Sequence, residues 1–287
     1  MGVKRLVKIN NVSGLAANAT TTIDFPIGPR YHAIWLSGTN IVGHTVGDGT
    51  VIKEVRIKVN GKTQRVANAT EYNDLNKLFG SQYGIQNDNA AVNFMLPFFF
   101  AEPWRKSYAA TDAMAWATGD LSSLQMEVDL GANAPSTLYA VVEVDNSIVV
   151  GQNGVVNQAP MGLISKWYKT LTPVNGTGLD LTTLPKRDFY QQISFYNSAI
   201  TKVTLKVDNF VIREWLKVEN DACLTSRGMT PVSSRFDLVI DYDDVPTSAL
   251  PMVNNGAKVQ DLFFHLDFSS SQSGNITTIY QLFGPAD

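Results

Sequence analysis

The sequence predicts an all-β protein made of two tandem domains of similar fold, on the basis of three observations. Segments of the first half recur in the same order in the second half. Apolar and polar residues alternate over many short stretches, which is typical of strands buried on one face. Asn-Gly, Asp-Gly and similar pairs separate these stretches at short intervals, as turns do in β-sandwiches and barrels.

The repeat is clearest between residues 52–66, IKEVRIKVNGKTQRV, and residues 200–214, ITKVTLKVDNFVIRE, which align without a gap. Two further pairs of segments match in the same order: 26–36 with 185–195, and 121–130 with 259–268. A repeat this long indicates two similar domains, because solenoids repeat about every 20–50 residues.

The first half is longer than the second between the matched segments. It carries about eleven extra residues between Leu36 and Ile52, and about ten more within 72–120, where loops absorb insertions at little entropic cost. We therefore expect the core strands to match and the loops to differ.

Alternation predicts strands at residues 55–59, 124–130, 138–144, 203–207 and 236–242. Asn60-Gly61 predicts a tight hairpin turn, and the matching Asp208-Asn209 is a weaker form of that turn. Asn175-Gly176 and Ser273-Gly274 are further turn signals.

Helical signals are scarce. The best candidate covers 69–80, where Asn68 and Glu71 form a capping-box pattern and Gly80 is a plausible end. The corresponding segment of the second half, 218–228, is shorter and also ends in Gly.

A Gly- and Asn-rich stretch at 145–162 with little charge indicates the connection between the domains. We place the first domain, with an N-terminal arm, at 1–150, a linker at 151–164 and the second domain at 165–287. A short strand is expected in the Ile-Val-Val sequence that begins at Ile148.

Composition narrows the function. Hydrophobic residues make up 44 %, enough for two cores, whereas charged residues make up 17 %, below the roughly 25 % of ordinary domains. Such a weakly charged surface is tolerable when much of it is buried against partner subunits. The net charge of −3 argues against sequence-specific nucleic-acid binding.

The cluster Lys4, Arg5 and Lys8 is either a solvated N-terminal arm or a contact for an acidic partner or lipid headgroups.

The beginning of the chain lacks the apolar core of a signal peptide, and no apolar run is long enough to span a bilayer. The single cysteine, Cys223, excludes an internal disulfide framework. Since Ala222 and Leu224 flank it and no base is adjacent, we expect a small buried residue rather than a nucleophile.

Signals for an active site are weak. His32, His44 and His265 form neither of the spacings that cupins and zincins use for metal. The acidic run Asp241–Asp244 could bind calcium through carboxylate oxygens, but it lacks the Gly and the distal Glu of an EF-hand loop. We therefore predict no catalytic, cofactor-binding or metal-ligating residue, and a protein that is not an enzyme.

Aromatic residues gather at Phe94, Phe98–Phe100 and Trp104. Three consecutive Phe side chains cannot face one side of a strand, because side chains alternate between its faces. We expect at least one of them to lie under a loop, a neighbouring domain or another subunit.

Taken with the helix after the Asn60-Gly61 hairpin and the basic N-terminus, the two tandem β domains resemble the double jelly-roll major capsid proteins of icosahedral phages with an internal membrane, the corticoviruses and tectiviruses. The resemblance implies two eight-stranded jelly-roll sandwiches with one or two short helices. It also implies a homotrimer that forms a pseudo-hexagonal capsomer, assembled in the host cytoplasm and found in the virion.

The expected partners are neighbouring capsomers, minor capsid or vertex proteins, and the inner membrane through Lys4, Arg5 and Lys8. The insertions at 37–50 and within 72–120 would be tower loops or intersubunit contacts, and the resemblance leaves calcium at Asp241–Asp244 open. The alternatives are a secreted-type double jelly-roll protein that binds or hydrolyses glycans, and a spike or minor vertex protein. A glycan-acting enzyme of the first kind would normally carry a signal peptide, and a double jelly-roll enzyme of the bicupin type would need clustered histidines; the sequence shows neither.

Overall fold

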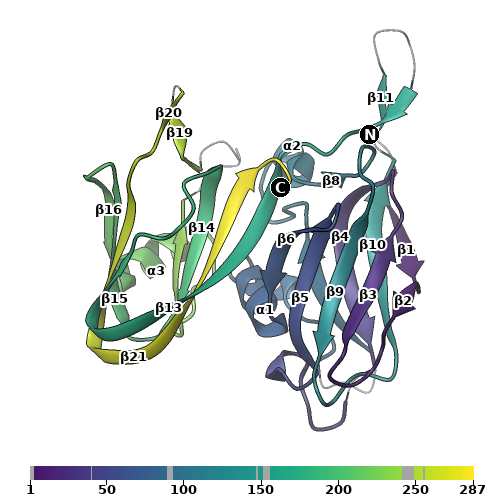
Figure 1. Ribbon diagram of the computed structural model, residues 1–287, viewed down its shortest axis with the longest axis horizontal. Helices are drawn as coiled ribbons and strands as arrows, with labels where there is room; N and C mark the ends of the chain where they lie inside the picture. Colours follow the sequence, from purple (N-terminus) through teal and green to yellow (C-terminus); the bar gives the residue numbers. More distant parts are fainter. Residues whose placement is uncertain are drawn as a thin grey trace. The chain divides into compact units, whose positions relative to one another are not determined.

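The computed structural model describes residues 3–39, 41–88, 93–146, 148–150, 156–240, 249–254 and 256–287. The chain forms two compact units, which we call unit 1, Met1–Trp167 with Pro285–Asp287, and unit 2, Tyr168–Gly284. Strands make up most of both units (Figure 1), which confirms the predicted all-β class.

Unit 1 is a sandwich of two antiparallel sheets. The first has the order β1 (Arg5–Ile9), β10 (Leu138–Asp145), β4 (Arg30–Gly38) and β7 (Phe94–Phe99), with β8 (Trp116–Ala117) paired to β4. The second has the order β2 (Val12–Ser13), β3 (Thr20–Phe25), β9 (Leu124–Leu130), β5 (Ile52–Val59) and β6 (Lys62–Ala67). Apart from the short β2 and β8, the chain alternates between the sheets except at the β5–β6 hairpin, which is the order of a jelly roll.

Burial follows the alternation predicted from the sequence. In β9, every second side chain from Leu124 to Leu130 is buried, and β10 follows the same pattern from Leu138 to Val144. Ile23, Ile57 and Met126 are fully buried between the two sheets. The apolar face of each strand thus fixes which side of the sheet faces the core.

Unit 2 contains the same strands in a more continuous form. Its outer pairs are β14 (Phe189–Tyr196) with β17 (Phe236–Val239) and β18 (Leu250–Pro251), and β15 (Ile200–Val207) with β16 (Phe210–Leu216). β21 (Leu262–Gly284) pairs with β15 through its first half and with β14 through its second half. β21 therefore pairs with one strand of each outer pair. β13 (Ile164–Leu181) lies next to β21 in the strand order.

Two predicted turns are wrong. Asn175-Gly176 lies inside β13 and Ser273-Gly274 lies inside β21, although both glycines have positive φ values of 126° and 99°. The glycines let these long strands change direction without ending, and both strands curve through unit 2 in Figure 1. Short hairpin strands complete the chain: β11 (Ile148–Val150) with β12 (Val156–Gln158), and β19 (Val253–Asn254) with β20 (Ala257–Lys258).

The predicted hairpin turns are present in both units. Asn60 and Gly61 have φ values of 50° and 79°, and Asp208 and Asn209 have values of 48° and 68°, the left-handed pair that a type I′ turn requires. Asn60 Oδ1 accepts hydrogen bonds from the amides of Ser122 (2.8 Å) and Ser123 (3.2 Å). Asp208 Oδ1 accepts the equivalent bonds from Gln260 (2.7 Å) and Asp261 (2.9 Å), so the repeat extends to single contacts.

A buried tyrosine marks the repeat a second time. The Tyr31 hydroxyl donates to the carbonyl of Pro26 at 2.6 Å, and the Tyr190 hydroxyl donates to the carbonyl of Pro185 at 2.7 Å. Burial raises the pKa of both tyrosines, so each stays a hydrogen-bond donor.

The described residues contain three α-helices, whereas the sequence predicted one or two. In α1 (Ala69–Lys77), Asn68 Oδ1 accepts from the Glu71 amide (2.7 Å) and Glu71 Oε2 accepts from the Asn68 amide (2.8 Å), which is the predicted capping box. α3 (Lys217–Ser226) is the predicted helix of unit 2. The additional α2 (Tyr108–Ala113) is a six-residue helix, too short to show a periodic apolar face in the sequence.

Two 3₁₀ turns, η1 (Val46–Asp48) and η2 (Ser81–Tyr83), lie before and after α1 in the chain. Among the helices that the structure describes, none has the length and apolar character needed to cross a membrane.

Candidate subunit interface

The outer strand of the second sheet of unit 1, β6, is covered by chain from elsewhere in that unit. Arg65 in its middle is fully buried, and Trp167 bridges to it in parallel register. Arg65 Nε donates to the carbonyl of Ser165 (2.9 Å), and Nη1 donates to the carbonyl of Phe99 (2.6 Å). The guanidinium also lies 4.9 Å from the ring centre of Trp167 and 5.2 Å from that of Trp116.

Burial lowers the pKa of Arg65 to about 10, so the group remains charged at neutral pH. The last residues of the chain add to the cover. The Asp287 amide donates to Gln64 Oε1 at 3.1 Å, and the Asp287 carboxylate pairs with the buried Lys166 ammonium at 3.0 Å. Residues 164–167 and 285–287 together therefore protect the edge of unit 1, an edge that would otherwise be open to association.

The matching strand of unit 2, β16, has an exposed apolar surface. Phe210 is 73 % exposed, Val211 55 % and Ile212 47 %. β16 stands at the end of the strand order, so it has a neighbouring strand on one side within the described residues. Large apolar side chains on a sheet edge favour binding to another chain.

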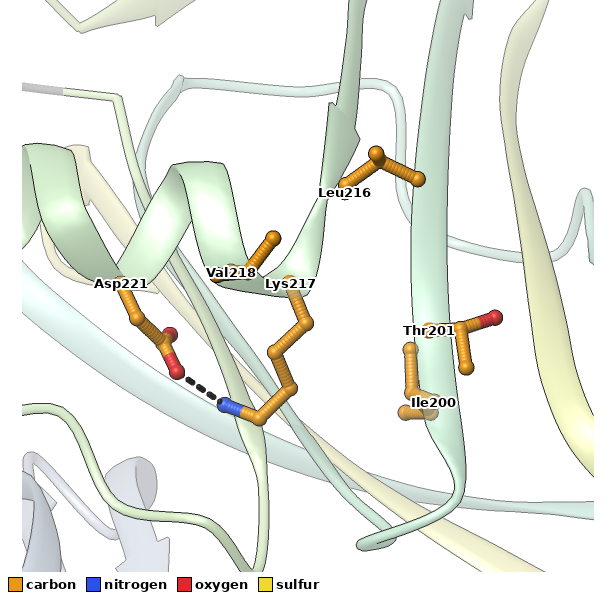
Figure 2. A pocket seen from close by; sticks show the side chains of 6 residues that line it. All are labelled: Ile200, Thr201, Leu216, Lys217, Val218 and Asp221. Atoms are coloured by element: carbon orange, nitrogen blue, oxygen red, sulfur yellow. Dashed lines mark hydrogen bonds and ion pairs between the residues drawn. The ribbon is translucent and has the colours of Figure 1, made fainter.

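An apolar groove continues this surface at the end of β16. It has a volume of about 490 Å³, and Figure 2 shows its lining side chains, which come from the start of β15 and from the β16–α3 junction. Leu216 and Val218 are 45 % and 72 % exposed. The ion pair between Lys217 Nζ and Asp221 Oδ2, 2.8 Å long, lies beside them.

Unit 1 fills the matching position with its own insertion. Val46 of η1 and Val51 are 2 % exposed, and the Thr70 hydroxyl of α1 donates to the carbonyl of Gly47. A Cβ atom on Gly47 would lie 2.8 Å from Thr70 Oγ1, so the loop approaches α1 closely. The η1 part of the insertion thus packs on α1 of its own unit, and unit 2, which lacks the insertion, keeps the groove open.

The basic residues at the N-terminus lie on unit 1. Lys4 Nζ pairs with Asp112 at 2.8 Å, and Lys8 Nζ lies 3.8 Å from the centre of the Tyr139 ring. Arg5 and Lys8 belong to β1, so the expected arm is shorter than the sequence suggested. Strand formation was missed because β1 does not alternate cleanly: Leu6 is apolar but exposed, and Arg5 lies on the same side of the strand as Val7 and Ile9.

Buried charge surrounds His32. Its Nδ1 lies 3.2 Å from Asp112 Oδ1, and its Nε2 lies 3.2 Å from Asp145 Oδ2. Burial alone would raise the pKa of Asp145, but hydrogen bonds and charge from Arg30 and His32 outweigh it and lower the pKa. The ring of His32 is 1 % exposed, which makes this an internal network of the sandwich.

The other two histidines are on the surface. His44 Nδ1 lies 2.9 Å from Asp48 Oδ2, and hydrogen bonds from Thr50 and His44 lower the pKa of Asp48 to about 2 despite the opposing effect of burial. His265 lies between Asp180 (2.5 Å) and Asp267 (3.1 Å). No set of three His, Cys, Asp or Glu side chains is placed to hold a metal ion within the described ranges, and Asp241–Asp244 lie outside them.

Cys223 is exposed, contrary to the expectation of a small buried residue. Asn220 and Leu224, four residues apart, are the buried positions of α3, and Cys223 falls on a different side of the helix.

The aromatic cluster follows the alternation of β7. Phe94, Phe98 and Phe100 are buried, whereas Phe99 points to the opposite side. There its ring meets Tyr83 and Trp104, at centroid distances of 5.5 Å and 5.9 Å. Phe99 therefore lies under the longer 72–120 region of its own unit.

The β16 surface was not predicted from the sequence, although the repeat carries its signal. At the matched positions, Lys62, Thr63 and Gln64 of β6 are replaced by Phe210, Val211 and Ile212 in β16. A change from polar to apolar residues on the outermost strand indicates that the two strands have different neighbours.

Comparisons with known proteins agree with this architecture. The family model for the viral coat protein P2 N-terminal domain matches residues 6–145, and that for the viral coat protein P2 C-terminal domain matches residues 164–285. No curated protein sequence matches the chain.

Several solved structures of viral capsid proteins have a similar fold. The major capsid protein P2 from bacteriophage PM2 is 16 % identical with a TM-score of 0.81, over 99 % of this chain and 98 % of that one. The structure of Sulfolobus Turreted Icosahedral Virus is 11 % identical with a TM-score of 0.66, over 99 % and 91 %. The PBCV-1 virus capsid is 7 % identical with a TM-score of 0.63, over 98 % and 93 %. At identities this low, the structural similarity shows a shared double jelly-roll fold.

Proposed function

The chain belongs to the viral coat protein P2 family, and from that premise we propose that three copies form a pseudo-hexagonal capsomer of an icosahedral virus shell. As a viral coat protein it is a structural component of the virion and not an enzyme. The proposal concerns the trimer and its partners.

The observation that carries the proposal is the duplicated jelly roll. Both units contain a type I′ hairpin turn, a buried tyrosine bonded to a proline carbonyl and a helix after the outer strand. Three chains with two similar units each approximate sixfold symmetry, which suits a hexagonal lattice. The exposed apolar edge of β16 supports a contact with another copy.

The proposed partners beyond the trimer are neighbouring capsomers and minor capsid or vertex proteins. We further propose a contact of Lys4, Arg5 and Lys8 with the acidic headgroups of an inner membrane, supported by their positive charge at the start of the chain. Calcium binding by Asp241–Asp244 stays a prediction. The glycan-binding alternative has no support from the family match.

Light scattering on a sizing column tests the trimer. We expect a species of about three times the 31.5 kDa mass of one chain that persists on dilution. A species with the mass of one chain at all concentrations would contradict the trimer, while leaving the family membership intact.

A further inference from the structure

The outer strand of unit 1 is covered, whereas no described residue covers the matching strand of unit 2, and the repeat indicates which segment could pair with it. We infer that β16 binds residues 3–6 of a second copy of this chain, an inference that rests on the proposed capsomer and that would leave Lys8 alone for the proposed membrane contact. The groove at the end of β16 shares Leu216 with this surface and extends it.

The cover of β6 defines the position of the missing segment. In unit 1, Trp167 bridges to Arg65, and Ile164–Trp167 are the first residues of β13. One of the two segments that protect the outer strand is therefore the segment that begins the first strand of a jelly roll.

The equivalent segment of unit 1 follows from the strand register. In β10, Val142 is opposite Ile34 of β4, and in β21, Tyr280 is opposite Ile193 of β14. Since Ile34 and Ile193 are matched positions of the repeat, Val142 corresponds to Tyr280.

The strand beside each of these residues gives the last step. Val7 of β1 pairs with Val142, and the Tyr168 ring of β13 lies 5.7 Å from the Tyr280 ring. Because each residue lies beside a matched position of the repeat, we match Val7 with Tyr168 and, by extension along the strand, residues 3–6 with residues 164–167.

The exposed side chains on the two segments suit each other. Val3 is 89 % exposed and Leu6 is 68 % exposed, although both are apolar. Phe210 and Ile212 of β16 are 73 % and 47 % exposed. Pairing the two segments would remove both sets from water, which is the main favourable term in protein association.

This pairing also explains how three copies could close into a ring. It joins unit 2 of one copy to unit 1 of the next, so the contact is head-to-tail, and head-to-tail contacts close into rings when the rotation permits. In a trimer, three outer strands would be covered within a chain and three between chains.

Cross-linking tests the pairing directly. The double variant Leu6→Cys/Ile212→Cys, made with Cys223→Ser to remove the exposed native thiol, is treated with a short bismaleimide reagent. We expect denaturant-resistant dimers and trimers of the chain, with cross-linked peptides that join position 6 to position 212. Each single variant, and Leu6→Cys paired with Val253→Cys, serve as controls and should give at least tenfold less product.

A trimer by light scattering without the 6–212 cross-link would overturn the inference and leave the proposed function standing. A species of one chain mass would overturn both.

A charge on β16 gives a second measurement. Ile212→Lys should raise the dissociation constant of the trimer at least tenfold, without changing the far-ultraviolet circular dichroism. Val253→Lys, at a residue that is 45 % exposed against 47 % for Ile212, is the matched control and should leave the trimer intact. Equal effects of the two changes would contradict the inference, and the cross-link decides the matter if Ile212→Lys does not fold.

Discussion

The two units share one strand order but differ where the chain passes from one sheet to the other. In unit 1, β9 ends at Leu130 and β10 begins at Leu138, whereas unit 2 runs through the same passage in one strand, β21. The loop of unit 1 contains Gly131 and Pro135, and proline removes a ladder hydrogen bond. The matching passage of unit 2, residues 269–275, has serines, a glutamine, an asparagine and one glycine but no proline, so the strand continues. The few residues between the two sheets therefore decide whether the chain forms two strands joined by a loop or one continuous bent strand.

The outer strands show the second difference. β6 is polar and covered, with Arg65 fully buried, while β16 is apolar and exposed. A duplicated domain keeps its core and changes the surfaces whose neighbours differ. The comparison can be tested by changing each unit at matched positions.

The largest effect is expected at the covered edge. Arg65→Ala should lower the free energy of unfolding by about 3 kcal/mol, because it leaves a cavity and two buried carbonyls without their donor. Arg213→Ala, at the matched and half-buried position of β16, should cost less than about 1 kcal/mol. Urea unfolding measures both, and equal losses would contradict the contrast between the edges.

The corner of unit 1 should be the next most sensitive place. A Cβ atom on Gly131 would lie 1.8 Å from the carbonyl oxygen of Thr50, so Gly131→Ala must move backbone. We expect a loss of about 2 kcal/mol. Gly162→Ala, with no atom within 4 Å of the added carbon, is the control and should be close to neutral in thermal unfolding.

The helix caps provide a smaller contrast. Asn68→Ala removes the side-chain cap of α1 and should cost about 1 kcal/mol. Leu216 at the same position of α3 offers no side-chain acceptor, so Leu216→Ala should change monomer stability by less than about 0.5 kcal/mol. A smaller loss from Asn68→Ala than from Leu216→Ala would show that the capping box does not stabilise unit 1.

The smallest effect is expected in the pH dependence of stability. Hydrogen bonds from Arg56 lower the pKa of Asp129. Burial alone would raise the pKa of Glu127, but hydrogen bonds from Lys58 and Arg56 outweigh burial and lower this pKa as well. Because both folded pKa values lie below the ordinary values of 3.8 and 4.5, their stabilisation is complete above those values and is lost as the pH falls further.

Arg56→Gln should therefore reduce the difference in Tm between pH 6 and pH 3, a range about the ordinary carboxyl pKa values. The matched residue of unit 2 is Thr204, so Thr204→Val should leave this difference unchanged. An unaltered pH dependence in Arg56→Gln would contradict the role of its ion pairs.

Sequence reasoning predicted the features that depend on neighbouring residues. Alternation located β5, β9 and β15, and the Asn60-Gly61 and Asp208-Asn209 turns were predicted because few residues adopt positive φ. The capping box of α1 followed from Asn68 and Glu71 for the same local reason.

The features that depend on distant contacts were not predicted. Arg65 looks like an outward polar residue in its strand, and its burial depends on Ser165 and Trp167, a hundred residues away. The continuity of β21 was missed because Ser273-Gly274 has the composition of a turn, while pairing with β14 and β15 keeps the strand extended. The β16 surface could be recognised only by aligning the two halves of the repeat and comparing the burial of the matched residues in the two units.

Electron microscopy of the purified chain tests the central claim most directly. If three duplicated jelly rolls form one capsomer, averaged top views will show six similar lobes with threefold symmetry. Particles with a single pair of lobes, at concentrations where the chain is fully folded, would contradict the account.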